Sequence, residues 1–496
     1  MLSMKKYSWL LFLLIVALAC PKNRAPQDPT YLKAPMVMIP GVPDTFEVAT
    51  EDPEGDEVQY RFNFGDGTIS SFGDYLPSGD TYKTTYTYNR TGEFYVKAQA
   101  QDRHKRSSNW SSAVRVFSGL GRIIWQLLPD DDYDCEVVST PAVDEQGNIY
   151  VGCREGHIHA LTANGNERWR FSAKYHDEFI SSVVIAPNGK LYCADRGGYL
   201  YRVNPINGTK EREAYLGDEI TATLAISPSN KLFINSIAGL HAYDENLNLL
   251  WRIDSICGVS SVAIDEAGYL YVGTEDGYFY SLDTLGNIRW RYNIGDEVIS
   301  SPAIIGQGKI CVGAQDGRLY LFDRNTGFIS RSSSYGAISS TPVVGTDGKI
   351  YATTEDGRLI KFRFDGSVID EEWTFSTDGY NSSSPAVVRL PNAGYDIVYF
   401  KVTWAKKSQE DMDSLYMIKS DGSRLAAAPI PQASPSDEGL VSSPMLLPSG
   451  IIVIGAGIDE DDTGGLVAIS ARGNLALTPW PLFRGNPKNT GCVTGK

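Results

Sequence analysis

A short motif recurs along the last three quarters of the chain and constrains its fold more than any other feature. Each copy has two small residues, mostly hydroxyl-bearing, followed by proline or an aliphatic residue. The third positions are separated by 42, 41, 38, 40, 40, 43 and 59 residues. A period of about 40 residues indicates a repeat architecture, in which each unit buries its apolar face against its neighbours. The eight copies are Ser139-Thr140-Pro141, Ser181-Ser182-Val183, Ala222-Thr223-Leu224, Ser260-Ser261-Val262, Ser300-Ser301-Pro302, Ser340-Thr341-Pro342, Ser383-Ser384-Pro385 and Ser442-Ser443-Pro444.

The residues after each motif predict four short strands. In the fifth repeat an apolar run is followed by a second strand at 309–313, the turn Asp316-Gly317 and a third strand at 318–323. An Asp-Gly pair between two apolar runs is a strong hairpin signal. Four antiparallel strands per repeat are typical of a propeller blade, so we expect an all-β, eight-bladed β-propeller over 122–485 and a tail over 486–496.

Tryptophan marks the fourth strand of many repeats. We expect the indole to fill the wide outer gap between neighbouring blades. Trp125 precedes the first motif, so its strand is predicted to close the ring against the last blade. The tryptophans concerned are Trp125, Trp169, Trp251, Trp290 and Trp373.

A smaller all-β module is predicted over 34–117. Val58, Tyr60, Phe62 and Phe64 alternate with polar residues, and similar alternation returns at 94–100. About seven strands of this kind suit an immunoglobulin-like sandwich. An acidic stretch at 52–57 carries oxygen ligands, but a solvated turn is the preferred interpretation, because calcium needs six to eight converging oxygens.

The first residues resemble a secretory signal. Two lysines precede an apolar stretch at 9–18 that is too short to span a bilayer, and small residues then lead to Cys20. This layout resembles the lipobox of bacterial lipoproteins. We therefore expect a signal peptide at 1–19, lipidation of Cys20, which would anchor the protein to the membrane, and a tether at 20–33.

Two further resemblances concern the folded modules. The segments 62–67, 86–88 and 92–102 resemble the polycystic-kidney-disease (PKD) domain, which serves as a spacer or weak binding module in extracellular proteins. The Leu-Tyr-Val-Gly strands, the Trp-bearing fourth strands and the closing segment at 479–486 resemble the pyrroloquinoline-quinone (PQQ)-like repeat. That family includes quinoprotein dehydrogenases and non-catalytic propellers, such as the lipoprotein of the outer-membrane barrel-assembly machinery.

The same resemblance leaves three functions open. The favoured one is a non-catalytic, lipid-anchored scaffold that binds envelope proteins, because the chain lacks the adjacent cysteines and the clear Asp-Tyr base segment expected of the dehydrogenases. The alternatives are a periplasmic PQQ-dependent oxidoreductase and a carbohydrate-binding surface protein. We expect no catalytic residues, no metal site and no cofactor, with PQQ and calcium left as alternatives, and a monomer in the cell envelope, at the outer membrane. The net charge of −15 argues against nucleic acid as a partner.

Three elaborated connections form the candidate partner-binding surface. They are the second-to-third strand turns of the seventh and eighth repeats and the link that enters the first repeat. These elements lie on one face of a propeller, and ring closure makes the three repeats neighbours. An acidic rim beside an exposed aromatic side chain would steer and anchor a basic partner. The candidate residues are Trp404, Lys406, Lys407, Asp459, Asp461, Asp462, Asp130, Asp132 and Tyr133.

The remaining cysteines allow disulfides if the protein is exported. Cys135 and Cys153 flank the first two strands of the first repeat and are the preferred pair, with Cys492 as an alternative partner for Cys135. Six cysteines allow 15 connectivities, so spacing alone leaves the pairing open.

Overall fold

The computed structural model describes residues 23–35, 37–38, 40–127, 136–381, 383–390, 394–403, 413–430, 442–456, 465–471, 474–475, 478 and 481–493. Every regular element in these ranges is a β-strand. Among them, no helix has the length and hydrophobicity needed to cross a bilayer. The chain divides into two compact units, the first ending at Ser118 and the second beginning at Gly119, with the short segment 36–39 grouped with the second.

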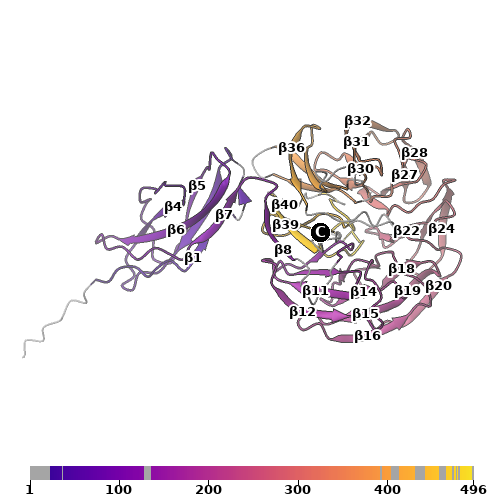
Figure 1. Ribbon diagram of the computed structural model, residues 1–496, viewed down its shortest axis with the longest axis horizontal. Helices are drawn as coiled ribbons and strands as arrows, with labels where there is room; N and C mark the ends of the chain where they lie inside the picture. Colours follow the sequence, from indigo (N-terminus) through magenta and orange to yellow (C-terminus); the bar gives the residue numbers. More distant parts are fainter. Residues whose placement is uncertain are drawn as a thin grey trace, which may run out of the picture. The chain divides into compact units, whose positions relative to one another are not determined.

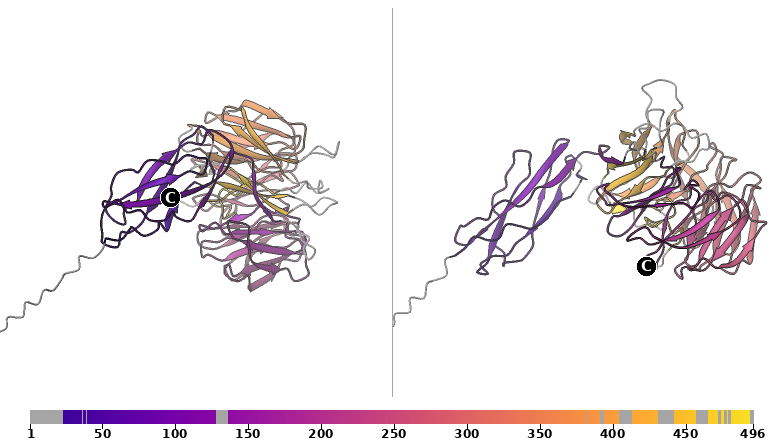
Figure 2. Two further views of the ribbon diagram at one scale, coloured as in Figure 1. Left: turned by 60° about the vertical axis from the view of Figure 1, so that its left-hand side comes forward. Right: turned by 60° about the horizontal axis from the view of Figure 1, so that its bottom comes forward.

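The first unit is a sandwich of two β-sheets (Figure 2). One sheet has the order β1-β3-β5 and the other the order β2-β7-β6-β4. The strands are β1 (Tyr31–Lys33), β2 (Val37–Met38), β3 (Asp44–Ala49), β4 (Val58–Asn63), β5 (Tyr82–Tyr86), β6 (Gly92–Asp102) and β7 (Val114–Ser118). The alternating residues Tyr60, Phe62 and Phe64 are buried, as their spacing predicts.

This sandwich begins earlier than we expected. β1 lies inside the predicted tether and pairs with β3, with Tyr31 opposite Ala49. Upstream of it, the Gln27 backbone N–H donates to Glu51 O at 2.9 Å. The alternation of apolar and polar residues did not reveal this edge strand, because three residues are too few to show a period. The prolines at 26 and 29 also favoured the interpretation of a tether.

The second unit is a ring of eight sheets around a common axis (Figure 1). Seven sheets have four strands, and the seventh blade has a fifth. Blades one and two contain β9 (Ala142–Val143), β10 (Ile149–Gly152), β11 (His157–Leu161) and β12 (Glu167–Ser172), then β13 (Val184–Ile185), β14 (Leu191–Ala194), β15 (Tyr199–Val203) and β16 (Lys210–Tyr215). Blades three and four contain β17 (Ala225–Ile226), β18 (Leu232–Ser236), β19 (Gly239–Tyr243) and β20 (Leu249–Ile253), then β21 (Ala263–Ile264), β22 (Leu270–Gly273), β23 (Tyr278–Leu282) and β24 (Ile288–Asn293).

Blades five and six contain β25 (Ala303–Gly306), β26 (Lys309–Gly313), β27 (Leu319–Asp323) and β28 (Gly327–Arg331), then β29 (Val343–Val344), β30 (Ile350–Thr353), β31 (Arg358–Phe364) and β32 (Ile369–Ser376). Blade seven contains β33 (Ala386–Arg389), β34 (Asp396–Val402), β35 (Ser414–Lys419), β36 (Arg424–Pro429) and the added β40 (Asn474–Leu475). Blade eight contains β37 (Met445–Leu446), β38 (Ile451–Ala456), β39 (Gly465–Ser470) and, as its outermost strand, β8 (Ile123–Leu127).

The strand order of blade eight confirms the predicted ring closure. β8 comes from the start of the unit and pairs with β39 near its end, with Trp125 opposite Ala468. The first and last segments of the ring are therefore held in one sheet, so the ring has no open seam.

The tryptophans lie between blades, as predicted. Each indole N–H donates to a backbone carbonyl in the turn between the third and fourth strands of the next blade. The ring also packs on a glycine of that turn, and at Gly208 an added Cβ would lie 2.5 Å from Trp169. The bonds run from Trp125 to Ala163 O (3.1 Å), Trp169 to Pro205 O (3.0 Å), Trp251 to Thr284 O (3.1 Å), Trp290 to Arg324 O (3.0 Å) and Trp373 to Ser420 O (3.2 Å).

Candidate functional site

One face of the propeller carries the turns between second and third strands together with the links that enter each blade. The two kinds of segment are bonded side by side. The backbone N–H groups of Arg154, Arg196 and Gln315, in the turns of blades one, two and five, donate to the carbonyls of residues 136, 178 and 297 at 3.1, 2.7 and 3.0 Å. We call this face, built from those turns and links, the upper face.

The predicted partner-binding residues fall on connections that begin and end at the upper face, but the residues themselves lie outside the described ranges. Trp404, Lys406 and Lys407 belong to 404–412, between β34 and β35. The acidic residues of blade eight belong to 457–464, between β38 and β39, and those of the first link to 128–135. The topology thus supports the shared face, while the proposed contacts stay predictions. The residues of the last two segments are Asp459, Asp461, Asp462, Asp130, Asp132 and Tyr133.

The described part of the upper face is rich in carboxylates. Arg196 bridges two links, with 3.1 Å to Glu178 and 2.7 Å to Glu219. In blade one, Arg154 lies 3.3 Å from Glu136, whose pKa is raised above its usual range mainly by burial, against the pull of this arginine. The turns and links together include Glu136, Glu155, Glu178, Glu219, Glu275, Glu297 and Glu355, with Arg154 and Arg196 among them.

A belt of hydrogen bonds joins the blades where their innermost strands begin. The backbone N–H of the second residue in one motif donates to the hydroxyl of the corresponding residue in the next blade. The bonds run from Thr140 to Ser182 (2.9 Å), Ser182 to Thr223 (3.1 Å), Thr223 to Ser261 (2.9 Å), Ser261 to Ser301 (3.2 Å), Thr341 to Ser384 (2.9 Å), Ser384 to Ser443 (3.0 Å) and Ser443 back to Thr140 (3.0 Å). The last bond joins blade eight to blade one, and blades five and six are joined instead by the Ser300 hydroxyl, which donates to Ser340 O at 2.7 Å.

The first residue of the motif accepts within its own blade at several positions, and in two blades its hydroxyl also donates to the next blade, from Ser260 to Ser300 O (2.9 Å) and from Ser300 to Ser340 O (2.7 Å). Ser139 accepts from the Gly152 N–H at 2.9 Å and donates to Gly152 O at 2.8 Å, and Ser340 makes the same pair of contacts with Thr353. The sequence showed the recurrence of small hydroxyl residues, but we assigned no role to their hydroxyl groups. Their hydrogen bonding was missed, although a hydroxyl at all eight second positions was the available signal.

The opposite end of the innermost strands is joined by one chain segment, 481–493, which we call the C-terminal segment. Its backbone carbonyls accept from inner-strand N–H groups of five blades. The bonds run from Val143 to Pro487 O (2.7 Å), Ile185 to Lys488 O (2.9 Å), Ile226 to Thr490 O (2.9 Å), Ile264 to Gly491 O (2.7 Å) and Val387 to Pro481 O (2.8 Å). We expected 486–496 to be a tail, whereas Asn489, Thr490 and Cys492 are buried in the structure.

Two side chains of the C-terminal segment are fully buried near the axis. Asn489 Nδ2 lies 3.2 Å from each of three inner carbonyls, Thr140 O, Pro141 O and Val183 O. Arg484 Nη2 donates to Leu224 O at 3.3 Å, and burial lowers the pKa of this guanidinium to about 9. The segment therefore forms part of the ring's core.

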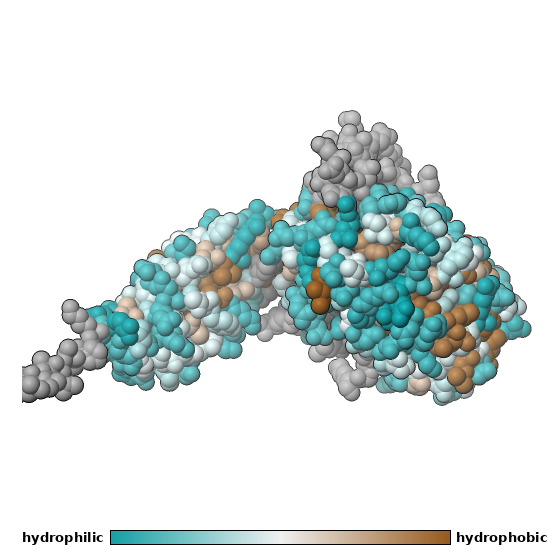
Figure 3. Space-filling model, turned by 90° about the horizontal axis from the view of Figure 1, so that it is seen from below, coloured by the Kyte–Doolittle hydropathy of each residue, from teal (hydrophilic) through white to brown (hydrophobic). Residues whose placement is uncertain are grey.

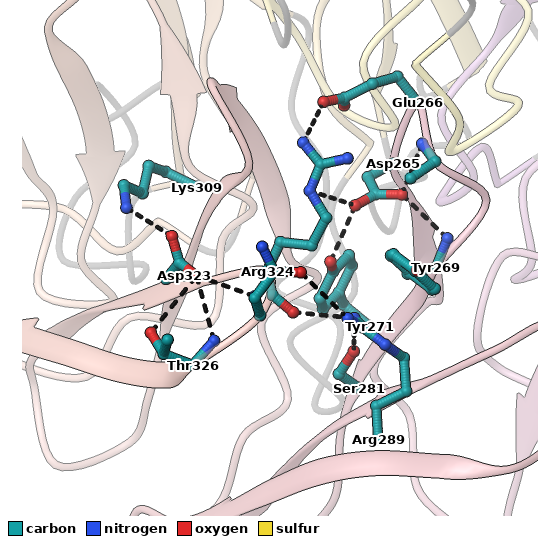
Figure 4. A network of polar contacts seen from close by, with 12 residues as sticks. Asp265, Glu266, Tyr269, Tyr271, Ser281, Arg289, Lys309, Asp323, Arg324 and Thr326 are labelled. Atoms are coloured by element: carbon teal, nitrogen blue, oxygen red, sulfur yellow. Dashed lines mark hydrogen bonds and ion pairs between the residues drawn. The ribbon is translucent and has the colours of Figure 1, made fainter.

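Polar networks also join neighbouring blades through the turns at the end of the ring where the C-terminal segment lies. In Figure 4, Arg324 of blade five extends to blade four, with its Nε 3.5 Å from Asp265 and its Nη2 2.5 Å from Glu266. Asp265 is buried and accepts from the Tyr271 hydroxyl at 2.9 Å. Since each charged group in this network has a protein partner, we assign the network to blade packing.

Exposed apolar side chains occur at both ends of the ring: Tyr175 and Tyr380 lie in links of the upper face, and Ile237 lies in its blade-three turn. Ile206 and Leu285 are in turns between third and fourth strands, and Leu249, Leu250 and Ile288 begin outer strands. Figure 3 shows one side of the propeller, which is largely hydrophilic with apolar side chains gathered in one area. The upper face thus carries its carboxylates beside a few exposed aromatic and aliphatic side chains.

The residues described at the upper face do not fit PQQ. This quinone carries three carboxylates, whereas the turns and links there are mainly acidic and would repel it. The hydroxyl belt is already engaged between blades, and the C-terminal segment occupies the other end of the axis. We derive no redox step from this arrangement.

The structure leaves the cysteine pairing untested. Cys135 lies outside the described residues, so its bond to Cys153, or alternatively to Cys492, stays a prediction. Cys153 is buried and its thiol lies 3.4 Å from His157 O.

Comparisons with known proteins agree with both modules. The family model described as outer membrane protein assembly factor BamB, a PQQ-repeat model, matches residues 111–363, and the PKD domain model matches 31–115. No curated protein matches the chain.

Two solved structures share the propeller fold. BamB from Moraxella catarrhalis is 15% identical with a TM-score of 0.53, and the match covers 70% of this chain and 98% of that one. The computationally designed Ika8 protein is 15% identical with a TM-score of 0.54, covering 71% and 100%. At these identities the likeness shows the fold alone. With the BamB model spanning just over half of its residues, the chain belongs to the BamB-like PQQ-repeat family, and it carries a PKD domain before the propeller.

Proposed function

We propose that this protein is a non-catalytic scaffold of the cell envelope, anchored at Cys20 by lipid to the outer membrane, whose propeller binds envelope proteins through its upper face. The family match supports an envelope protein that works by protein interaction. The observation that carries the proposal is the upper face itself, where carboxylates from several blades gather on bonded turns and links. A rigid charged surface of this kind steers a partner of opposite charge.

The partner is expected to present basic groups and an apolar pocket. The three elaborated connections of blades seven, eight and one would add Asp130, Asp132, Asp459, Asp461 and Asp462 to the acidic rim, and Trp404 would supply the apolar anchor. Aromatic side chains at the centre of an interface commonly dominate its binding energy. Lys406 and Lys407 beside Trp404, and Tyr133 in the first link, would then help to set the partner's orientation.

The test is co-purification of the full-length protein from its own envelope. Trp404→Ala should reduce recovery of the partner at least about tenfold, since truncated interface anchors cost 2 kcal/mol or more. Neutralising Asp459, Asp461 and Asp462 to Asn should weaken capture most at low salt, because long-range attraction is screened as salt rises.

Two matched variants serve as controls. Ile206→Ala removes an exposed apolar side chain in the turn between β15 and β16, and Glu145→Gln removes an exposed carboxylate in the turn between β9 and β10. Both should leave capture unchanged. If Trp404→Ala and the triple variant fold and capture the same partners as the parent protein, the upper face is not the binding surface.

A further inference from the structure

We propose that the PKD domain binds a divalent transition-metal ion of the zinc type through Asp56, Asp102 and His104. One ligand atom from each of these side chains lies within 4.8 Å of the other two. Asp56 lies just before β4, while Asp102 ends β6 and His104 follows it, and Val58 pairs with Asp102 in the sheet. The register of two paired strands therefore holds the three groups together.

Burial of carboxylates is the second observation. Asp102 is fully buried, and within the described residues its carboxylate accepts from two neutral donors, the Asn23 side-chain amide at 2.7 Å and the Arg106 backbone N–H at 2.8 Å. A buried carboxylate is costly unless a cation pairs with it or a metal binds it. Asp56, as a second carboxylate close by, increases that cost through like-charge repulsion.

A third carboxylate adjoins the cluster. Asp52 is 5% exposed, and its Oδ1 accepts from the backbone N–H groups of Glu54 and Asp56 at 3.0 and 3.1 Å. Its Oδ2 is buried and has no hydrogen-bond partner within the described part of the chain. This turn thus brings an unpartnered acceptor to the side of the site formed by Asp56.

The nitrogen ligand selects the class of metal. His104 Nδ1 lies 3.2 Å from Asp56 Oδ2, so the imidazole already points at the carboxylates. Protonated histidine would neutralise one negative charge at most, whereas a divalent ion neutralises two. Zinc and related ions accept imidazole nitrogen with carboxylate oxygen, while calcium prefers six to eight oxygens.

A metal here would also fasten the start of the module. Asn23 donates to Asp102, and Arg24 pairs with Glu54 at 2.8 Å in the adjoining turn. Ligation of Asp102 would fix the carboxylate that holds Asn23. We therefore expect metal binding to raise the unfolding temperature of the PKD domain.

The experiment uses tag-free full-length protein, stripped with a chelator that is then removed. Titration with zinc chloride by calorimetry should show one saturable site, and a thermal scan should show stabilisation by zinc. His104→Ala and Asp56→Asn should each weaken zinc binding more than about tenfold, since even residues that only orient metal ligands account for 10- to 100-fold in affinity. Both side chains are partly exposed, so circular dichroism can establish that the variants fold.

His176→Ala is the matched control, because this exposed histidine of the propeller lies near His157, with ring centroids 5.6 Å apart. It should leave zinc binding intact. The proposal is overturned if no saturable zinc site appears, if His176→Ala removes the site while His104→Ala does not, or if calcium binds more tightly than zinc and His104→Ala leaves that binding unchanged.

Discussion

The innermost strands of the propeller are joined differently at their two ends. Where they begin, the same kind of bond, from a backbone N–H to the hydroxyl of the next motif, joins seven of the eight pairs of neighbouring blades. Where they end, one irregular segment passes five blades and offers each a different carbonyl. The first arrangement is a nearest-neighbour interaction of the repeat, and the second depends on the whole ring.

The difference between the two ends predicts where a substitution should cost little stability and where it should cost much. A hydroxyl in the belt has equivalents in the other blades, so its loss affects one contact between two neighbours. The C-terminal segment has no equivalent, and its carbonyls satisfy several blades at once. We therefore expect the two ends to respond very differently to mutation.

Deletion of 481–496 should have the largest effect. It removes the backbone carbonyls that accept hydrogen bonds from the backbone N–H groups of five inner-strand residues, Val143, Ile185, Ile226, Ile264 and Val387. At about 1 kcal/mol for each lost bond, the free energy of unfolding should fall by roughly 5 kcal/mol. Urea unfolding followed by tryptophan fluorescence measures this change.

Lys488→Ala is the control for the deletion, because Lys488 contributes its backbone carbonyl while its side chain forms an exposed pair with Glu145. It should change stability little, as exposed ion pairs are worth about 0–1 kcal/mol. An unchanged urea midpoint for the deletion would show that the segment is dispensable, and the contrast between the two ends would fail.

Ser384→Ala should have an intermediate effect at the belt. It removes the acceptor for the Thr341 N–H at 2.9 Å and leaves that buried donor unpaired, at a cost of about 1–3 kcal/mol. Ser181→Ala is matched in chemistry and burial, but the Ser181 hydroxyl has no hydrogen-bond partner among the described residues. Blade three already carries Ala222 at the equivalent position.

We expect Ser181→Ala to be neutral within about 0.5 kcal/mol, which is the usual range for changes that remove no specific interaction. Chemical unfolding of both variants side by side makes the comparison. Equal losses would mean that the hydroxyls act through packing rather than through the bonds between blades.

The smallest change should be a pH effect at the C-terminal segment. Because burial lowers the pKa of Arg484 to about 9, the folded protein releases this proton at a lower pH than the unfolded chain. Between that pH and the ordinary arginine value, the unfolded state binds more protons, so stability contributed by this group rises with pH. Relative to Arg484→Met, the wild-type protein should gain up to about 1.4 kcal/mol per pH unit above pH 9.

Other titrating groups are common to both proteins, so the difference between their unfolding free energies isolates Arg484. Unfolding free energies measured from pH 8 to 11 give the slope of this difference against pH. Parallel pH profiles would indicate that the buried guanidinium keeps its ordinary affinity for the proton.

The local pattern was enough to predict much of the fold. Asp-Gly turns and alternating strands specify a blade, and the position of Trp125 before the first motif predicted the strand that closes the ring. The sandwich was visible in the alternation at Tyr60 and Phe62. These features depend on spacing within one repeat or one strand, where side-chain period and turn chemistry act directly.

The candidate site was predictable only in outline. The described strands that flank the three elaborated connections end at the upper face, whereas the positions and contacts of Trp404 and the other residues in those connections remain predictions. The charged residues of the other blades were not singled out, because each glutamate looks ordinary within its own repeat. Arg196 meets Glu178 and Glu219 only when consecutive blades pack together.

By itself the sequence determined the period, the strands of each blade, the indoles between blades and the hydroxyl at the start of each inner strand. Only the tertiary structure decided which carbonyls the C-terminal segment offers to which blades, and that Asp56 meets Asp102 and His104. The physical reason is that a repeat encodes the contacts between neighbours in its own spacing. Contacts between segments far apart in sequence arise only when the ring closes and strands pair in register, which no local pattern records.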